Sequence, residues 1–204
     1  MSLLRFCEKG RIEAGCDEAG RGCLAGPVVA AAVVLPERTQ LHRLDDSKKL
    51  TEKARERLVP MIKNEALAWG IGVVGPKDID RLNILNASFL AMHKALDALV
   101  LQPDLLLIDG NRFQAYKQIE YRCMIKGDGR FRSIAAASIL AKQHRDQLMR
   151  ELHGEHPHYD WQRNKGYPTA AHRRAISKMG PCIQHRQSFR LLPEQLHLPL
   201  EGPS

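Results

Sequence analysis

The sequence lacks the cysteine patterns that cross-link secreted proteins or hold structural zinc. Its five cysteines are odd in number and include no CxxC pair. A disulfide framework or a structural zinc site is therefore not expected, and this cysteine usage favours a reducing cytoplasm. The sequence also has no apolar run long enough to span a bilayer. Charged residues (Arg5, Glu8 and Lys9) interrupt the N-terminal apolar stretch, which is unlike a signal peptide. We expect a cytoplasmic protein with no membrane partner.

Length and composition indicate one globular unit with a polyanionic partner. The chain has 204 residues, of which 44% are hydrophobic and 26% charged. This suffices for one sizeable core and is short for two. We expect a single monomeric domain over residues 1–190, with a helical C-terminal part and a flexible tail over residues 191–204. The net charge of +8 favours nucleic acid as a partner.

Apolar runs and helical periodicities alternate along the chain. Three helices are expected. The first begins after its N-cap Thr51, the second covers residues 76–100, and the third runs from Ser133 to about residue 152. Pro60 should kink or shorten the first of these. Alternation over residues 66–74 puts alanine and glycine on one face, which suits close packing by a helix. Strands are predicted at residues 12–16, 28–35, 66–74, 105–108 and 119–125. This order indicates an α/β fold.

Acidic residues stand at the ends of two of the predicted strands. Asp17 and Glu18 follow the first, and Asp109 follows the strand at 105–108. If these strands are neighbours, their ends lie about 5 Å apart, and Asp128 in a glycine-flanked loop could complete the set. Clustered carboxylates need cations, and all-oxygen ligation suits Mg²⁺ or Mn²⁺. Two such ions can serve phosphodiester hydrolysis. The alternatives are a charged turn between strands and an Asp109 that only caps a turn.

Six short motifs lie in order between about residue 10 and about residue 190. They are Asp17-Glu18-Ala19-Gly20-Arg21-Gly22, Asp46-Ser47-Lys48-Lys49-Leu50, Ile108-Asp109-Gly110, Lys126-Gly127-Asp128, the helix at 133–142, and Gly166-Tyr167-Pro168-Thr169. Together they resemble ribonuclease HII. The resemblance implies a ribonuclease-H-like fold, with a central mixed β-sheet flanked by helices and a helical C-terminal segment. It also implies cleavage of RNA in RNA/DNA hybrids and of single ribonucleotides embedded in duplex DNA.

The resemblance also implies roles for individual residues. The catalytic, metal-binding carboxylates would be Asp17, Glu18, Asp109 and Asp128. The loop Gly20-Arg21-Gly22 would sense the ribose 2′-OH, and Tyr167 would pack at the junction between ribonucleotide and deoxyribonucleotide. Further candidates for substrate contact, each with a solvated surface residue as its alternative, are Ser47, Lys48, Lys49, Arg130, Lys142 and Lys165.

Two other signals carry less weight. The histidines at 153, 156 and 158 have no regular ligand spacing and flank Pro157, so a surface loop is favoured over a metal site. Asp146 lies four residues after Lys142, which favours a structural ion pair. Alternatives to the main hypothesis are a resolvase or exonuclease of the same fold and a basic binding module without chemistry. The acids argue against the module, because without metals they would repel a phosphate backbone.

The C-terminal hexapeptide Gln195-Leu196-His197-Leu198-Pro199-Leu200 resembles the peptide by which many bacterial repair proteins bind the DNA sliding clamp. Two leucines could enter an apolar pocket, and neighbouring prolines would reduce the entropy lost on binding. The alternative is a tail that folds back on the body or is inert.

Overall fold

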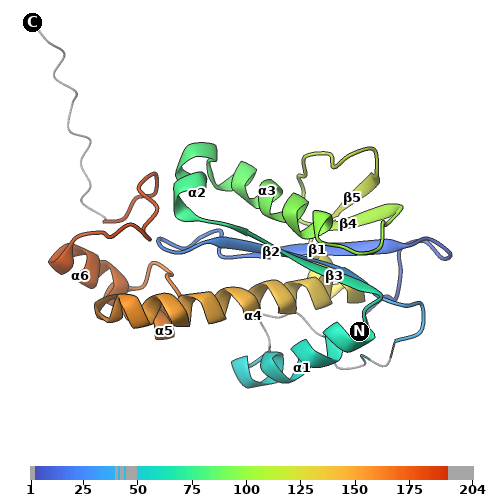
Figure 1. The fold of residues 1–204 in the computed structure, drawn as a ribbon, viewed down its shortest axis with the longest axis horizontal. Coiled ribbons are helices and arrows are strands. Elements are labelled where there is room, and N and C mark those ends of the chain that lie inside the picture. The colour runs from blue at the N-terminus through green and yellow to red at the C-terminus, as the bar shows by residue number, and fades with distance from the viewer. Residues whose placement is uncertain (1–2, 40, 42–43, 45–49, 193–204) are drawn as a thin grey trace, which may run out of the picture.

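One five-stranded mixed sheet forms the centre of the molecule in the computed structural model, which describes residues 3–39, 41, 44 and 50–192 (Figure 1). The strand order is β3-β2-β1-β4-β5. The first three strands in this order pair antiparallel, and β4 runs parallel to both β1 and β5. The expected α/β fold with a central mixed sheet is confirmed. The strands are β1 (Glu13–Ala19), β2 (Val28–Val34), β3 (Ala68–Val74), β4 (Leu105–Asp109) and β5 (Glu120–Met124).

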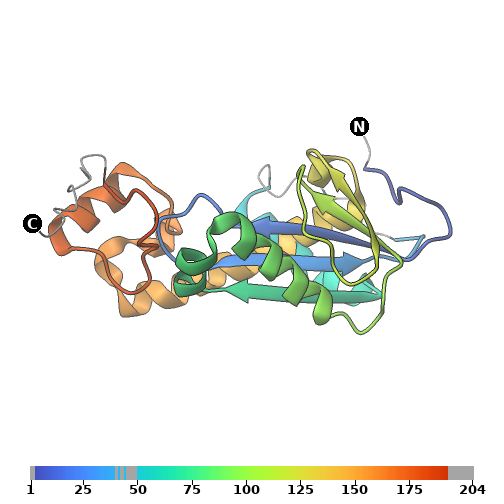
Figure 2. The same ribbon diagram turned by 90° about the horizontal axis from the view of Figure 1, so that it is seen from above.

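Helices cover both faces of this sheet and extend it at one end. Helices α2 and α3 lie on one face, and α4 lies on the other with α1 beside it (Figure 1). Helix α4 runs past the sheet, where α5 and α6 form a C-terminal lobe (Figure 2). The helices are α1 (Glu52–Glu65), α2 (Pro76–Leu82), α3 (Ile84–Asp97), α4 (Arg132–Glu155), α5 (Trp161–Asn164) and α6 (Ala170–Met179), with the 3-10 turns η1 (Gly127–Gly129) and η2 (Pro157–Tyr159).

Strand β2 is buried on both faces, as its continuous apolar run predicts. All seven of its residues are buried. Ala30 and Ala32 belong to the core under α3, whereas Ala31 and Val33 belong to the core under α4. Because successive side chains of a strand point to opposite faces, one strand of small and β-branched residues serves both cores.

The small-residue face of β3 allows α3 to approach the sheet closely. A Cβ added at Gly72 would lie 1.9 Å from the Ala91 carbonyl oxygen, and one at Gly70 would lie 2.1 Å from that of Ala95. Any side chain at either glycine would therefore push the helix away. The predicted close packing by a helix is confirmed.

Four sequence-based expectations need correction. Strand β1 continues to Ala19, so Asp17 and Glu18 lie inside the strand and not beyond its end. Helix α1 runs through Pro60 to Glu65, because Leu58 and Ile62 pack into the core on either side of it; the expected shortening was wrong. Residues 76–100 form two helices, divided at Asn83, whose φ is 66°. Helix α4 continues to Glu155, beyond the expected end at residue 152.

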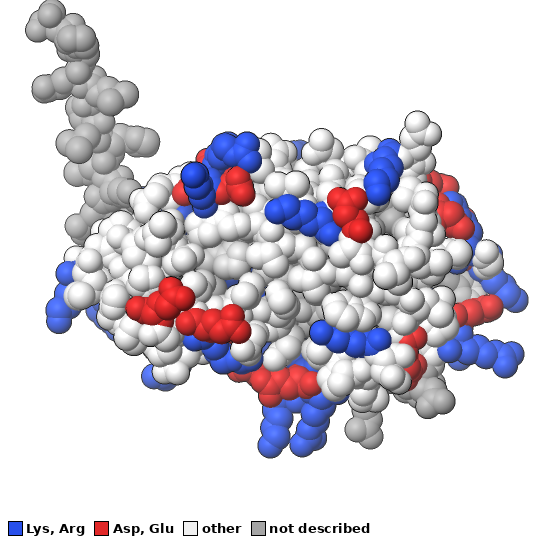
Figure 3. Space-filling model, in the orientation of Figure 1, with Lys and Arg blue, Asp and Glu red and all other residues white. Residues whose placement is uncertain are grey.

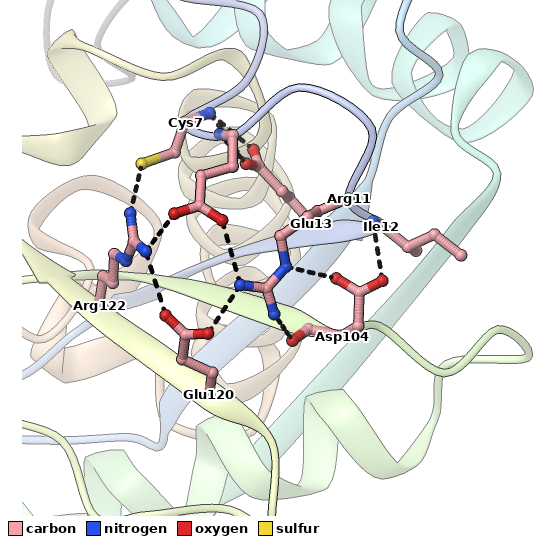
Figure 4. Close-up of polar contacts among 8 residues, drawn as sticks. Cys7, Arg11, Ile12, Glu13, Asp104, Glu120 and Arg122 are labelled. Carbon is pink, nitrogen blue, oxygen red and sulfur yellow. Dashed lines mark hydrogen bonds and ion pairs between the residues drawn. The ribbon is translucent and has the colours of Figure 1, made fainter.

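A polar network fastens the N-terminal segment to the end of the sheet where β1, β4 and β5 begin (Figure 4). Arg11 donates to Asp104, just before β4, and to Glu120 of β5, at 3.0 and 2.7 Å. Arg122 donates to Glu120 at 3.1 Å and also contacts Glu8. Each exposed pair contributes little stability alone. Together they hold the starts of β1, β4 and β5 in register, and the register decides which side chains meet at the other end.

The helices in the described part of the chain are too short or too polar to cross a bilayer. The domain boundary at residue 190, the monomeric state and the cytoplasmic location stay predictions. Residues 193–204, which include the hexapeptide at 195–200, lie outside the described residues.

Candidate active site

Three aspartates from separate parts of the chain meet at one end of the sheet, where β1 and β4 finish. Strands β1 and β4 are parallel, with Cys16 opposite Ile108, so Asp17 and Asp109 follow on neighbouring strands. The turn η1 carries Asp128 to the same place. Carboxylate oxygens of Asp17, Asp109 and Asp128 all lie within 4.8 Å of one another. The structure thus brings these three residues together as expected.

Backbone hydrogen bonds hold Asp109 and Asp128 in this position. The Gly127 N–H donates to Asp109 Oδ1 at 2.7 Å, which ties η1 to the end of β4. The Gly129 N–H donates to Asp128 Oδ1 at 2.9 Å. Lys126 begins the turn with a φ of 54°, in the left-handed region. This tight turn folds Asp128 back over the sheet, where it is 4% exposed.

Burial and neighbouring charge both act on the Asp17 carboxyl, which is 4% exposed. Burial is the largest cause that raises the pKa of Asp17 well above its usual value, and the charges of Glu18 and Asp109 raise it further. Hydrogen bonds from the Ser138 hydroxyl and the Glu18 N–H act in the opposite direction. Carboxylate oxygens held this close together, with no nitrogen or sulfur donor in the cluster, fit a hard divalent cation such as Mg²⁺ or Mn²⁺.

Glu18 lies beside the cluster of three aspartates and not within it. As the next residue of β1, it points to the other side of the strand from Asp17. Its carboxylate accepts a hydrogen bond from Arg21 at 3.1 Å. Glu18, Arg21 and Asp109 line a cavity of about 340 Å³, which Asn111 and Arg112 border. The cavity next to these acidic residues therefore lies between α3 and the loop after β4.

The loop Gly20-Arg21-Gly22 leaves β1 directly beside these acids. Gly20 has a φ of 96°, and a Cβ there would lie 2.0 Å from Arg145 Nε, so only glycine fits. A Cβ at Gly22 would meet nothing within 4 Å, and Arg21 and Gly22 are both exposed. The loop is thus packed against α4 at its first residue and open at its third.

Tyr167 stands close to this loop, in the connection from α5 to α6. Tyr167 is 39% exposed, and it contacts Cys23, the residue after Gly22. The Leu24 N–H donates to the Gly166 carbonyl at 2.8 Å, which joins the two segments. Burial is the main cause that raises the pKa of Tyr167, and Cys23 contributes to the rise. The ring therefore stays neutral at physiological pH and offers a partly exposed face next to the glycine loop.

Lys142 and Asp146 form the ion pair that their spacing predicts. The ammonium of Lys142 lies 2.5 Å from Asp146 Oδ1, and Arg55 donates to Asp146 Oδ2 at 3.2 Å. Asp146 is 1% exposed and lies outside the cluster of three aspartates, as expected. Lys142 nevertheless lies 5.7 Å from the ring centroid of Tyr167. It is held at the rim of the site rather than left to solvent.

The other candidates for substrate contact are less well placed or lie outside the described part of the chain. Ser47, Lys48 and Lys49 fall among residues 45–49, which the structure does not describe. Lys165 contacts Glu52 at 3.5 Å and is 11% exposed at its side chain. Arg130 is exposed and lies over the ring of Phe131 at 5.3 Å.

The histidine-rich stretch forms an aromatic cluster. His156 stacks edge-on against Trp161 at 5.6 Å, and His158 lies 4.1 Å from Tyr159. Within the described ranges, the aspartates at 17, 109 and 128 are the sole group of side chains spaced to hold a metal ion. The stretch is the end of α4 followed by η2 rather than the surface loop that the sequence favoured.

Sequence reasoning missed three residues that shape the site. The Ser138 hydroxyl donates to Asp17; it lies within the motif at 133–142, which gave it no role of its own. Arg145 and Arg186 are both fully buried and donate to backbone carbonyls around the glycine loop. Nothing in composition or periodicity distinguishes a buried arginine from a surface one, so these two are visible only in the structure.

Comparisons with known proteins agree with this geometry. The family model described as Ribonuclease HII matches residues 14–192. Ribonuclease HII of Parabacteroides distasonis is 59% identical over 196 residues, which cover 96% of this chain and 98% of that protein.

Two solved structures share the fold at lower identity. One is ribonuclease HII in the PCNA complex from Archaeoglobus fulgidus (TM-score 0.73, 24% identity, covering 86% of this chain and 92% of that one). The other is Bst-RNase HIII with Mn²⁺ (TM-score 0.69, 20% identity, 89% and 68%). The fold is therefore that of ribonucleases HII and HIII, which is ribonuclease-H-like. With a family match that spans the three aspartates, the glycine loop and Tyr167, the chain belongs to the ribonuclease HII family and is a metal-dependent endonuclease of the ribonuclease H type.

Proposed function

We propose that the protein hydrolyses the phosphodiester on the 5′ side of ribonucleotides, in RNA/DNA hybrids and at single ribonucleotides in duplex DNA. The products would carry a 3′-OH and a 5′-phosphate. The observation that supports this most directly is the meeting of Asp17, Asp109 and Asp128 beside an exposed glycine loop and Tyr167. The three aspartates suit phosphodiester chemistry, and the glycine loop with Tyr167 suits recognition of a sugar.

The three aspartates together with Glu18 would hold the metal, Mg²⁺ or Mn²⁺. The raised pKa of Asp17 supports this, because a buried carboxylate among other acids gains most from a bound cation. The complex of Bst-RNase HIII with Mn²⁺, a protein of the same fold, supports it as well. Divalent cations held there would lower the pKa of a bound water and stabilise negative charge on the leaving oxygen. Ser138 would keep the Asp17 carboxylate oriented, and Gly127 would do the same for Asp109.

The glycine loop and Tyr167 would select the ribonucleotide. Reading a 2′-OH requires polar groups that reach the sugar closely, and an exposed backbone without a Cβ at Gly22 permits this approach. A site built to bond a hydroxyl can reject a substrate without it by a factor of about 10⁴ or more. The Tyr167 ring would pack against the sugar at the junction, with Lys142 close enough to contact a phosphate. Ser47 and Lys48 keep their proposed substrate contacts on sequence grounds alone.

Charge does not mark a position for the duplex on the face seen in Figure 3. On the face seen in Figure 3, basic and acidic side chains alternate, and no single basic patch dominates. The position of the duplex therefore follows from the acids and the loop. A resolvase or exonuclease would not need Gly20–Gly22 beside Tyr167, so this pairing favours the ribonucleotide-directed activity over the two alternatives.

Labelled duplexes with zero, one or four ribonucleotides test the proposed function. In Mg²⁺ or Mn²⁺ the enzyme should cut the second and third substrates on the 5′ side of a ribonucleotide, and EDTA should abolish cleavage. Asp109→Asn should lose activity, whereas Asp78→Asn, whose side chain is 44% exposed and pairs with Arg81, is the control. Cleavage of the all-DNA duplex at a comparable rate would refute the assignment.

We also propose that the tail at 195–200 binds a DNA sliding clamp. The complex of the Archaeoglobus fulgidus ribonuclease HII with PCNA supports this kind of partner. A clamp would raise the local concentration of the enzyme at newly made DNA. A peptide of residues 191–204 should bind the clamp with a dissociation constant in the micromolar range (about 10⁻⁶ M, or about 8 kcal/mol of binding free energy), and Gln195→Ala with Leu198→Ala should abolish binding. No clamp binding by the full-length protein at tens of micromolar, about ten times that constant, would contradict the proposal.

A further inference from the structure

A C-terminal segment without helix or strand runs across the back of the glycine loop. We call residues 182–189 the C-terminal strap. Its His185 pairs with Ala25 in an isolated antiparallel bridge. The Gly26 N–H donates to the Gln184 carbonyl at 2.8 Å, and the Arg186 N–H donates to the Leu24 carbonyl at 2.9 Å. The strap is thus hydrogen-bonded along the segment that follows the glycine loop.

Arg186 of the strap reaches into the glycine loop itself. Its guanidinium donates to the carbonyls of Gly20 and Arg21 at 2.8 and 2.9 Å. It also donates to those of Gly26 and Pro27, at 3.0–3.2 Å. The side chain is fully buried, and burial lowers its pKa to about 10. Burial of this charge carries a desolvation penalty, which hydrogen bonds to four carbonyls offset. Only the planar guanidinium of arginine, with its five N–H donors, can bond all four carbonyls at once.

These bonds fix the direction of two peptide groups. In a planar trans peptide the C=O and the N–H point in opposite directions. With the Gly20 and Arg21 carbonyls turned inward to Arg186, the N–H groups of Arg21 and Gly22 face away from the strap. Both residues are exposed, and Arg21 lines the cavity together with Glu18 and Asp109. The N–H groups that could bond a ribose hydroxyl are therefore aimed by Arg186.

The same strap connects to Tyr167 through two histidines. The Cys182 N–H donates to His185 Nδ1 at 3.0 Å, so the proton of His185 lies on Nε2, 3.2 Å from His172 Nε2. The Trp161 indole N–H donates to His172 Nε2 at 2.9 Å, so His172 carries its proton on Nδ1 and donates it to the Tyr167 carbonyl at 2.9 Å. The strap thus contacts the glycine loop directly through Arg186 and reaches Tyr167 through His185 and His172.

Helix α2 anchors the far end of the strap. The Asp80 carboxylate accepts hydrogen bonds from the Gln187 N–H and the Ser188 N–H, each at 2.9 Å. It accepts a third from the Ser188 hydroxyl at 2.6 Å. The residues immediately after Arg186 are therefore held to the body of the protein, which limits how far the guanidinium can move.

We propose that Arg186 is a positioning residue that orients the Arg21 and Gly22 N–H groups toward the ribose, and that the strap keeps this loop aligned with Tyr167. The proposal rests on the proposed role of the glycine loop in sensing the 2′-OH. It adds a residue that touches neither metal nor substrate, yet sets the preference for ribonucleotides.

Arg186→Lys provides the test, because lysine keeps the charge but cannot bond four carbonyls. Binding is measured with Ca²⁺ in place of Mg²⁺, on a duplex with one ribonucleotide and on the matching all-DNA duplex. The preference for the first should fall at least about tenfold, as expected for misplaced hydrogen-bond donors. The Mg²⁺ concentration for half-maximal cleavage should not change, because the aspartates are untouched. Equal weakening on both duplexes, or a shifted Mg²⁺ requirement, would overturn the proposal.

Two further variants keep the test decisive. Asp80→Ala should also lower the preference for the duplex with one ribonucleotide. If Arg186→Lys does not fold, Asp80→Ala replaces it in the test, and an unchanged preference in Asp80→Ala would then overturn the proposal. Arg173→Lys is the control, because Arg173 also donates to carbonyls of the C-terminal segment, at Arg190 and Leu191, but not to the loop. Wild-type protein without any preference would overturn the proposed function itself. A wild-type preference that Arg186→Lys retains would overturn only the role of the strap.

Discussion

Replacing Asp17 with asparagine should stabilise the metal-free protein while abolishing cleavage. Asp17 is 4% exposed, and its carboxylate lies within 4.8 Å of those of Asp109 and Asp128. Two unit charges about 5 Å apart repel by about 1 kcal/mol in water and by about 3 kcal/mol at an effective dielectric constant of about 20. Asparagine keeps an oxygen that can accept from the Glu18 N–H, and it removes the charge. The free energy of unfolding should therefore rise by about 1–3 kcal/mol.

The size of this gain depends on pH, in a direction that the raised pKa of Asp17 determines. Between its unfolded and folded pKa values, the folded protein binds more protons than the unfolded chain. Wild-type stability therefore falls as pH rises through this window. Asparagine does not titrate, so its advantage should be smallest near the unfolded pKa of about 4 and largest above the folded pKa.

Thermal unfolding in EDTA measures the effect, because each kcal/mol shifts Tm by about 2–4 °C in a chain of this size. Asp78→Asn removes a charge from an exposed pair and should shift stability by less than about 0.5 kcal/mol. Saturating Mg²⁺ should stabilise the wild type and narrow or reverse the difference, since a ligand that binds the folded state stabilises it. An Asp17→Asn protein no more stable than the wild type in EDTA at pH 8 would refute the reasoning, as would near-normal turnover in Mg²⁺.

Three further predictions concern Tyr167, Lys142 and Asp146. Tyr167→Ala should impair cutting at an isolated ribonucleotide more than cutting of a long hybrid, because only the former presents a mixed junction; equal losses in kcat/KM would remove the tyrosine from this role. Lys142→Ala should lower the slope of log K against log salt by about 0.9 if the lysine contacts one phosphate, and an unchanged slope in a binding titration would place the duplex elsewhere. Asp146→Asn should destabilise the protein by about 3 kcal/mol in urea unfolding, because it removes the charge that faces the buried guanidinium of Arg55; a loss below about 1 kcal/mol, as for an exposed pair, would contradict this.

The strands, the start of the first helix and the acidic residues of β1 and β4 could be predicted from the sequence because local patterns determine them. Val28–Val34 is a strand because continuous β-branched and alanine residues suit a site buried on both faces. Thr51 begins α1 because its hydroxyl accepts from the Ala54 N–H, a bond that depends on the adjacent turn alone. The short motifs also identified the family, since each combines residues close together in the chain.

Other features were decided only by tertiary structure, where local preference gives way to packing. Helix α1 continues through Pro60 because the residues around it are buried. The role of Arg186 depends on contacts with Gly20 and Pro27, more than 150 positions away in the sequence. The sequence by itself identified the acidic residues that we propose carry the chemistry, because their residue type and position after apolar runs mark them locally. The fold decided how the glycine loop is held and aimed, because that depends on buried charges that only long-range contacts bring together.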